Sequence, residues 1–504
     1  MVMPSQALSM KRAVMVPTFS SGLKRSANGR LGTGARCASA LATSPTAPAR
    51  RTPLNHARRY ICRSRDAMAD CSSSPPRPQA CASTADTSPA AWASIRTFDQ
   101  GGAKKPMNAR ALVGLVVLIA IVAAVILNQL RDDGEGVRIG FVTTLTGGSA
   151  AIGQDMRDAF ELALDHMGRT MAGRKVTVLY EDDAQNPDIG LQKTERLVQR
   201  DGVQFVTGYI WSNVLLASYR AGIAGGAIVI SANAGPSELA GAQCTPNFFS
   251  TSWQNDQTPM AMAEVLNKRN LSNVYVLAPN YAAGRNMVAG FKRSFRGTIV
   301  AEEYTQWPDH LDFAAELAKI RAANPSAVWF FFPGNYGTQF FKQYAQAGLL
   351  AQIPLYSTFS IDTLNLPQIG EMVVGSQLTQ HWGADLDVPA NRRFVDDFRK
   401  KHGRTPSFYA AQAYDSAVLI KSAVEATRGN LQDRDALRTA LERANFESVR
   451  GAFRFGRNHF PVQSFYVWEV VRGADGAYAL KLGDRVFTDH ADPYAGDCRM
   501  AAAP

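Results

Sequence analysis

Short apolar segments alternate with amphipathic segments from Val137 almost to the end of the chain. The β-branched run VRIGFVTTL is followed by QDMRDAFELALDHMGR, in which Phe160, Leu164 and Met167 recur at helical spacing. The run KVTVLYEDD is followed by a second segment of this kind, PDIGLQKTERLVQRDG. Such alternation predicts parallel strands joined by crossover helices.

Further apolar runs extend the pattern toward the C-terminus. They are VQFVTGY, AIVISAN, VYVLAPN, GTIVAEEYT, AVWFFFP and IPLYSTF. One small sheet does not need so many strands, so we predict an α/β protein of two doubly wound lobes. Near the end, GAFRFGRNHF and SFYVWEVVRGADGAYALK predict a strand pair with a turn at GADG.

Residues 1–106 do not have the pattern of a folded domain. They are rich in Ser, Ala, Pro, Thr and Arg, and no apolar periodicity lasts long enough to build a core. Two interpretations are open: a disordered basic extension, or sequence upstream of a true start at Met107. We favour the second, because Met107 is followed by Arg110 and a long apolar run, which is the layout of an export signal.

Residues 107–130 are predicted to be a signal peptide or an N-terminal membrane anchor. The apolar run covers 111–127 and is shorter than the roughly 20 residues that a membrane span needs. No small-residue cleavage site follows it, and no cysteine for a lipid anchor. Both alternatives place the body outside the cytoplasmic membrane, in the periplasm, and the positions of Arg110 and Asp132 favour that orientation.

Charge and motifs exclude several functions. The first 106 residues hold 16 basic and 4 acidic residues, which leaves 38 basic and 39 acidic ones for the body, so we expect no nucleic-acid partner. The loop 147–154 lacks the lysine of a phosphate-binding loop. Asp182 and Asp183 have no third ligand at metal spacing, and the seven histidines form no zinc motif. No GxSxG elbow is present, so we expect no enzyme, no metal and no cofactor.

The body contains two cysteines, Cys244 and Cys498. In an exported protein they can form a disulfide that ties the C-terminal tail to the body. The alternative is a buried free thiol and a second thiol in the tail.

The loops that follow five successive strands carry aromatic, hydroxyl, amide and small residues. In open α/β sheets, ligands bind outside the carboxyl ends of the strands. This mixture suits a small, flat or partly apolar ligand with one polar or anionic end. The candidate ligand-binding residues are Trp211, Ser212, Asn213, Asn233, Ala234, Gly235, Tyr281, Asn335, Tyr336, Phe359 and Asp362.

Seven stretches of the body carry a family resemblance. They are IGFVTTLTGGSAAIGQDMRDAFELAL, YEDDAQNP, ISANAGPSEL, FFSTSWQNDQTPMA, VYVLAPNYAAGRNMVAGFK, DFAAELAKIRAANPSAVWFF and PSFYAAQAYDSAVLI. In this order and spacing, the chain resembles the type I periplasmic binding proteins of branched-chain amino-acid importers, in the subgroup associated with aromatic and other carboxylic acids. The resemblance covers about residues 137–498.

The resemblance implies two lobes joined by three crossover segments, with the ligand cleft between them. Lobe 1 would hold 137–253 and 380–449, and lobe 2 would hold 254–379 and 450–498. Closure of the lobes on the ligand would signal the permease and ATPase subunits of an ABC importer. We expect a monomer, because such a clamp needs both lobes free to hinge.

The resemblance also implies roles for individual residues. The residues after ISA would offer backbone N–H groups to a ligand carboxylate, here without the family's hydroxyl. The serine of the preceding loop matches Ser212 or Asn213, and the second-lobe tyrosine matches Tyr281. Gly334 or Asn335, beside Tyr336, aligns with a ligand-facing tyrosine.

The informative departure is Phe359, which stands where amino-acid binders place a glutamate for the ligand ammonium. A desolvated ammonium without a carboxylate costs several kcal/mol. We therefore expect an aromatic or apolar carboxylate. Asp362 would replace the missing glutamate if it turned inward, and then a branched-chain or other amino acid remains the alternative ligand. A membrane-anchored sensor built on the same module is the alternative function.

Overall fold

A computed structural model describes residues 114–123 and 136–500. The chain divides into two units, Met1–Gly102 and Ala103–Pro504, and all described residues belong to the second. The predicted extension 1–106 lies outside the described residues. Of the predicted signal or anchor, 107–130, only residues 114–123 are described, and they are helical. None of the helices in the described ranges has the length and apolar character needed to cross a membrane.

The first sheet has six strands in the order β2-β3-β1-β4-β5-β6. All neighbours pair in parallel except β2 and β3. β1 is buried at every position but Arg138, as expected of a parallel strand with both faces covered. The strands are β1 (Val137–Thr143), β2 (Thr170–Met171), β3 (Arg174–Asp182), β4 (Phe205–Gly208), β5 (Ile228–Ser231) and β6 (Phe248–Ser250).

The second sheet has eight strands in the order β12-β13-β11-β10-β9-β7-β8, with β14 paired to β13. Its middle is parallel, whereas β12, β13 and β14 are antiparallel to their neighbours. The strands are β7 (Asn273–Pro279), β8 (Thr298–Thr305), β9 (Ala327–Phe330), β10 (Leu355–Thr358), β11 (Gln377–Gln380), β12 (Arg454–Phe455), β13 (Pro461–Arg472) and β14 (Tyr478–His490).

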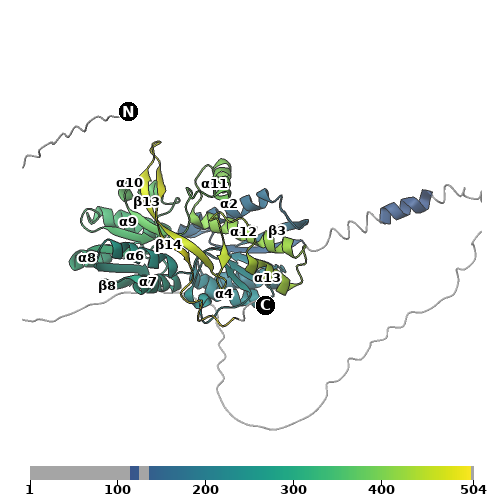
Figure 1. The fold of residues 1–504 in the computed structure, drawn as a ribbon, viewed down its shortest axis with the longest axis horizontal. Coiled ribbons are helices and arrows are strands. Elements are labelled where there is room, and N and C mark those ends of the chain that lie inside the picture. The colour runs from purple at the N-terminus through teal and green to yellow at the C-terminus, as the bar shows by residue number, and fades with distance from the viewer. Residues whose placement is uncertain (1–113, 124–135, 501–504) are drawn as a thin grey trace, which may run out of the picture. The chain divides into compact units, whose positions relative to one another are not determined.

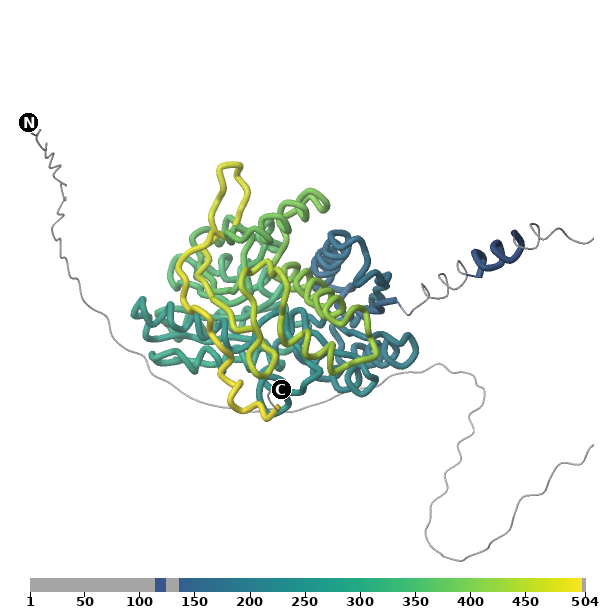
Figure 2. Tube along the Cα trace, turned by 45° about the vertical axis from the view of Figure 1, so that its right-hand side comes forward, coloured from purple at the N-terminus to yellow at the C-terminus, as the bar shows by residue number. Residues whose placement is uncertain are grey.

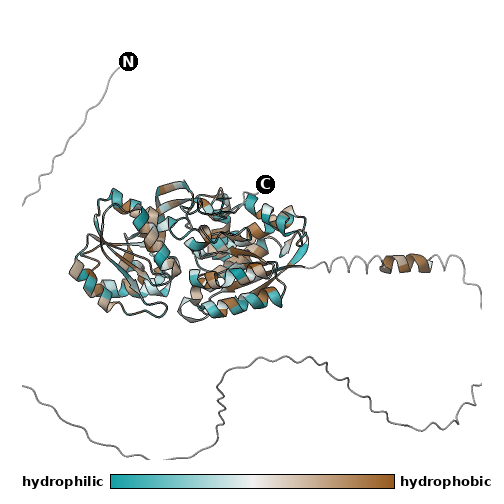
Figure 3. Ribbon diagram, turned by 90° about the horizontal axis from the view of Figure 1, so that it is seen from below, coloured by the Kyte–Doolittle hydropathy of each residue, from teal (hydrophilic) through white to brown (hydrophobic). Residues whose placement is uncertain are grey.

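Helices cover both sheets. Each sheet together with its helices is called a lobe here, and Figure 3 shows apolar strands between helices whose outer faces are more polar. Lobe 1 contains the first sheet with η1 (Gly147–Ser149), α2 (Ala150–His166), α3 (Pro187–Gln199), α4 (Ser212–Ala224), α5 (Ser237–Ala240), α11 (Pro389–His402), α12 (Phe408–Ala426) and α13 (Arg434–Arg443). Lobe 2 contains the second sheet with α6 (Gln257–Lys268), α7 (Ala282–Ser294), α8 (Ala314–Ala323), α9 (Asn335–Gln346) and α10 (Leu366–Val373).

The chain passes between the lobes three times, through residues 251–256, 381–388 and 444–453. Figure 1 shows the resulting arrangement, with α6 to α9 around one sheet and α2, α4 and α12 around the other. The predicted two-lobed α/β fold with three crossovers is confirmed. Figure 2 shows β13 and β14 as one long hairpin, and its turn falls in the predicted GADG stretch.

Three short strands, β2, β6 and β11, had no clear signal in the sequence. β6 and β11 contain three and four residues, so neither is long enough to display a periodicity. Both complete the sheets beside longer strands. Their carboxyl ends lead directly into the first two connections between the lobes, 251–256 and 381–388.

Candidate functional site

A small cavity lies between the lobes at the carboxyl ends of β4, β5, β7, β9 and β10. Its free volume is about 20 Å³, which is room for about one water molecule. A larger molecule enters only if the lobes part or the lining side chains turn. The lining residues are Ile210, Trp211, Ser212, Asn233, Ala234, Trp253, Asn255, Tyr281, Ala283, Met287, Phe331, Pro333, Phe359 and Tyr409.

One side of this cleft cavity is a cluster of aromatic rings contributed by both lobes. Trp211 of lobe 1 lies 6.4 Å, centroid to centroid, from Tyr281 of lobe 2. Trp307, from the loop after β8, stacks on Tyr281 at 4.3 Å and lies 5.2 Å from Trp211. A hydrogen bond fixes the orientation of the Trp211 indole, because its Nε1 donates to Thr144 Oγ1 at 2.8 Å. Thr144 in turn donates to Asp183 at 2.6 Å.

Trp253 and Phe359, which also line the cavity, belong to a second aromatic group. Trp253 stacks on Phe359 at 4.0 Å, and Phe408 lies 4.8 Å from Phe359. Phe359 is 1 % exposed and has a φ of 53°, a backbone conformation that few bulky residues adopt. Strained positions of this kind concentrate where a structure must hold a side chain in one place.

The start of α4 provides hydrogen-bond donors at the cavity wall. The helix begins at Ser212, and its preceding residue Trp211 provides no side-chain cap. The first N–H groups of a helix have no intrahelical acceptor, and they carry the positive end of its dipole. Ser212 Oγ accepts from Asn255 Nδ2 at 3.2 Å, so its own proton is free to be donated. This corner therefore suits an anionic group.

Asn233 and its neighbours form the adjoining wall. Asn233 Nδ2 donates to the Ile210 carbonyl at 2.7 Å, whereas its buried Oδ1 has no partner among the described residues. The N–H of Ala234 donates to the Tyr209 carbonyl at 2.9 Å, so this expected ligand donor is already used. The unpartnered Oδ1 is an acceptor that a ligand hydroxyl would satisfy.

Six of the eleven sequence-predicted residues line the cleft cavity, and five do not. Those that line it are Trp211, Ser212, Asn233, Ala234, Tyr281 and Phe359. Those outside it are Asn213, Gly235, Asn335, Tyr336 and Asp362.

The five outlying residues have other surroundings. Asn213 is the second residue of α4, and Gly235 fits so closely that a Cβ atom would lie 2.0 Å from the Trp253 carbonyl oxygen. Tyr336 packs 4.8 Å from Trp307 and accepts a hydrogen bond from Gln185 of lobe 1 at 3.1 Å.

Asn335 is the first residue of α9. It accepts from Gln339 Nε2 at 3.4 Å, and its Nδ2 lies 3.7 Å from where a Cβ of Gly148 would stand. Gly148 belongs to lobe 1, so Asn335 contributes to the contact between the lobes rather than to the cavity wall.

Asp362 does not enter the cleft cavity. Its Oδ1 accepts from the N–H groups of Leu364 and Asn365, at 2.8 and 3.1 Å, just before α10. The carboxyl lines a second, larger cavity instead. Burial raises the pKa of Asp362 to about 6.

We expect the raised pKa of Asp362 to show in the pH dependence of stability. A carboxyl with a raised folded-state pKa stabilises the folded protein below its unfolded pKa of about 3.9, and this contribution is lost as the pH rises through about 6. Asp362→Asn does not titrate. The difference in unfolding free energy between wild type and variant should therefore fall by about 2 kcal/mol from pH 4 to pH 7. Urea unfolding at four pH values measures it, and a constant difference would contradict the assignment.

Sequence reasoning missed several residues of the cavity. Trp253 follows the short β6, and Tyr409 belongs to the first turn of α12, where Ser407 Oγ accepts from its N–H at 3.1 Å. Phe331 directly follows β9. Trp307 does not line the cavity, but it stands in an irregular loop and packs on the lining residues Trp211 and Tyr281. Aromatic residues in loops were the usable signal, although only the tertiary structure shows which of them converge.

The other motifs have structural roles. Asp182 accepts from Leu145 N at 2.8 Å and Thr146 Oγ1 at 2.7 Å, and these hydrogen bonds lower its pKa although burial opposes the shift. The described residues contain no group of three or more His, Cys, Asp or Glu placed to hold a metal. Cys244 and Cys498 are joined in a disulfide.

Comparison with known proteins agrees with the fold. The family model described as "Periplasmic binding protein" matches residues 136–477. Among curated proteins, the Leu/Ile/Val-binding protein homolog 6 of Brucella suis biovar 1 is 26% identical over 354 residues, covering 68% of this chain and 90% of the relative.

Two solved structures are similar to this chain and share a slightly higher sequence identity with it. One is an ABC transporter solute-binding protein from R. palustris in complex with benzoate, with 30% identity and a TM-score of 0.69, covering 72% of this chain and 100% of that chain. The other, from Rhodopseudomonas palustris BisB5, is in complex with 3,4-dihydroxybenzoic acid, with 27% identity and a TM-score of 0.66, covering 71% and 99%.

Proposed function

This chain belongs to the periplasmic binding protein family, and from that premise we propose that it is the extracytoplasmic receptor of an ABC importer for a small aromatic carboxylate. One observation carries the choice of ligand. The fourteen residues that line the cleft cavity include six aromatic residues and no Asp, Glu, Lys or Arg. The six are Trp211, Trp253, Tyr281, Phe331, Phe359 and Tyr409.

The lack of a charged residue in this wall disfavours a free amino acid. An α-ammonium group taken out of water needs a carboxylate or several acceptors, and its desolvation otherwise costs several kcal/mol. A carboxylate can be held without a cation, because the first N–H groups of α4 and the Ser212 hydroxyl are donors. The stacked rings of Trp253 and Phe359 then suit a flat, apolar body.

The state described here is a closed one for such a ligand. The cavity holds about one water, and Trp307 bridges Trp211 and Tyr281 across the lobes. Binding would begin with the lobes apart, and closure would bring the two aromatic groups against the ring of the ligand. Permease and ATPase subunits would recognise the closed form, as the family implies. The chain would act outside the cytoplasmic membrane and without catalysis.

The test is a ligand panel on the purified full-length protein. We expect benzoate and 3,4-dihydroxybenzoate to raise the melting temperature, because a ligand at 100 times its Kd adds about 2.7 kcal/mol of stability. Leucine, and the neutral benzyl alcohol, should give no shift at equal concentration. A shift with leucine but not with benzoate would contradict the proposed ligand class and leave the receptor function standing. Calorimetric titration then gives the Kd and a stoichiometry of one.

A further inference from the structure

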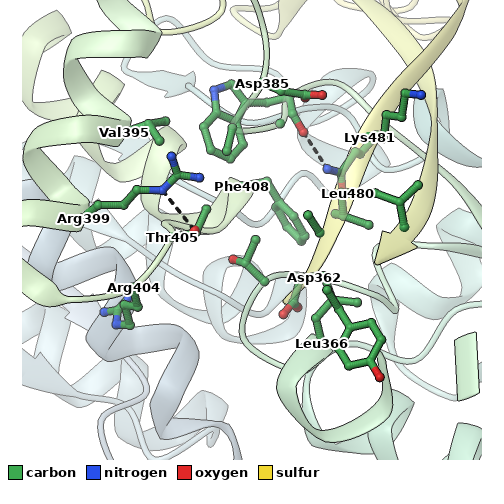
Figure 4. A pocket seen from close by; sticks show the side chains of 18 of the residues that line it. Asp362, Leu366, Asp385, Val395, Arg399, Arg404, Thr405, Phe408, Leu480 and Lys481 are labelled. Atoms are coloured by element: carbon green, nitrogen blue, oxygen red, sulfur yellow. Dashed lines mark hydrogen bonds between the residues drawn. The ribbon is translucent and has the colours of Figure 1, made fainter. Parts of the chain in front are cut away.

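A second cavity, much larger than the first, lies between the lobes. Its free volume is about 710 Å³, within the range of small-molecule sites. α11 and the segment before α12 form the lobe 1 side, and the start of α10 and the β13–β14 hairpin form the lobe 2 side. Figure 4 shows this arrangement, with Arg399 and Arg404 facing Leu480 and Asp362 across the space. The cavity is therefore a second place where a molecule would contact both lobes.

Two buried hydrogen-bond acceptors in its wall have no donor. Asp362 uses Oδ1 for the N–H groups before α10, but its Oδ2 has no partner among the described residues. Gln380 donates from Nε2 to the Trp382 carbonyl at 2.6 Å, which fixes its amide orientation and leaves Oε1 equally unpartnered. Each residue is only 1 % exposed. Buried acceptors of this kind are costly unless a donor reaches them.

Four basic residues line the cavity, Arg392, Arg399, Arg404 and Lys481, and none of the ion pairs among the described residues joins one of them to Asp362. Arg392 is paired with Asp387. Arg404 is paired with Asp155 and, at 2.6 Å, with Asp158 on α2. The Nε of Arg399 donates to Thr405 Oγ1 at 3.1 Å, as the dashed line in Figure 4 marks. Within 136–500, the ion pairs include none to Asp362. No cationic side chain among the described residues neutralises the Asp362 carboxylate, so a bound cation would complete its interactions.

Part of the remaining wall is apolar and aromatic, although Asp385, Asp396, Arg392 and Lys481 also line it. Phe408, Trp382 and Leu366 are each at most 2 % exposed, and Leu480 closes the hairpin side. Aromatic faces attract cations, and apolar side chains favour a hydrocarbon body. A ligand with one donor-bearing, positive end and an apolar remainder matches both kinds of surface.

Aromatic rings separate this cavity from the cleft cavity. Phe359 lines the cleft cavity and Phe408 lines the second one, and their ring centroids are 4.8 Å apart. Trp253 belongs to the same partition, because its ring lies 4.0 Å from Phe359 and 5.8 Å from Phe408. A molecule in the second cavity therefore does not occupy the site proposed for the carboxylate.

The geometry points to a second ligand site in this cavity, for a small primary amine with an apolar body, whose ammonium group is held by Asp362 Oδ2 and Gln380 Oε1. Its ring or alkyl part would lie against Phe408 and Leu480. Because the site contacts both lobes, its occupant would stabilise the arrangement of lobes described here relative to a more open one. The inference does not depend on the ligand of the cleft cavity.

Calorimetric titration of the purified full-length protein with 2-phenylethylamine at pH 7.5 tests this site. We expect one molecule to bind, and to bind at least tenfold more weakly to Asp362→Asn, which keeps the size of the side chain and removes its charge. The neutral analogue 2-phenylethanol should bind at least tenfold more weakly than the amine to wild type. Ala479→Trp provides a second variant, because residue 479 is an exposed position of β14 that borders the cavity, and the added ring should block binding.

Competition locates the amine. We expect its Kd to be the same with and without saturating benzoate, because the partition keeps the two molecules apart. Displacement by benzoate would place the amine in the cleft and overturn the inference. So would the absence of binding at 10 mM amine, where about 10 mM is the weak limit we set for a specific site of this size. Equal affinity in wild type and Asp362→Asn would overturn it as well. Melting curves of both variants establish that they are folded, and benzoate titration of wild type tests the cleft proposal separately.

Discussion

Replacing Arg450 by methionine is expected to lower the free energy of unfolding by about 3–5 kcal/mol, because it leaves the buried carboxylate of Asp415 without its ion-pair partner. The Arg450 side chain is 5% exposed, and its Nη2 lies 3.0 Å from Oδ2 of Asp415, which is fully buried in α12. Burial raises the pKa of the Asp415 carboxyl even with Arg450 beside it. Removing the arginine therefore leaves the Asp415 carboxylate unpaired, although its charged form is already costly to bury.

The position of Arg450 adds a second effect. It lies in the third connection between the lobes, and it donates to the carbonyl oxygens of Thr251 and Ser252 in the first connection, at 2.6 and 3.1 Å. It also donates to Gln463 Oε1 at 2.9 Å, in β13. One guanidinium thus fixes two of the three connections to each other. We expect its loss to loosen the connections as well as to destabilise lobe 1.

Chemical unfolding of wild type and Arg450→Met measures the first effect. Arg454→Met is the matched control, because Arg454 is an exposed residue of β12 and such substitutions usually change stability by less than about 0.5 kcal/mol. The double variant Asp415→Asn with Arg450→Met should recover part of the loss, since no charge then remains buried. Equal stability of Arg450→Met and Arg454→Met would refute the proposed role of this ion pair.

The sequence allowed the fold to be predicted because its strands are buried on both faces. Runs such as Val137–Thr143 have to be apolar throughout in a parallel sheet, and they therefore stand out between amphipathic helices. The ends of these strands meet at one edge of each sheet, so Trp211, Tyr281 and Phe359 were expected near one another before any geometry was known. The structure places all three in one cavity wall.

The rest of the site depends on features that no local pattern contains. Tyr409 is 2 % exposed at the start of a helix whose first ten residues are all buried, so the helical period there is uninformative. Asp362 is three residues from Phe359 in sequence, but the left-handed backbone at Phe359 and the hydrogen bonds from Leu364 and Asn365 to Asp362 direct the two side chains to different cavities. Short loops of this kind reverse direction within one or two residues, which sequence spacing does not reveal.

Phe359→Glu is expected to weaken benzoate binding by at least 100-fold. The substitution places a carboxylate in the wall of a small cavity that holds no cation and that also contains the start of α4, whose donors would hold the ligand carboxylate. Like charges brought together in a buried site cost several kcal/mol, and a 100-fold change corresponds to about 2.7 kcal/mol. If burial raises the pKa of the new glutamate so far that it is protonated at pH 7, the weakening should be smaller at pH 7 and should grow as the pH is raised, because the repulsion appears only with the charge.

Phe359→Gln is the matched control for this prediction, since it has the size and polarity of the glutamate without its charge. Both variants lose the stacking of Phe359 on Trp253, which is expected to reduce affinity by about tenfold, so the difference between them isolates the charge. The measurement is the Kd of benzoate for each folded variant. The same titrations with leucine ask whether a carboxylate at residue 359 is sufficient to receive an ammonium group. Equal benzoate affinity in the glutamate and glutamine variants would mean that the ligand carboxylate lies far from residue 359, and would remove the charge argument from the choice of ligand.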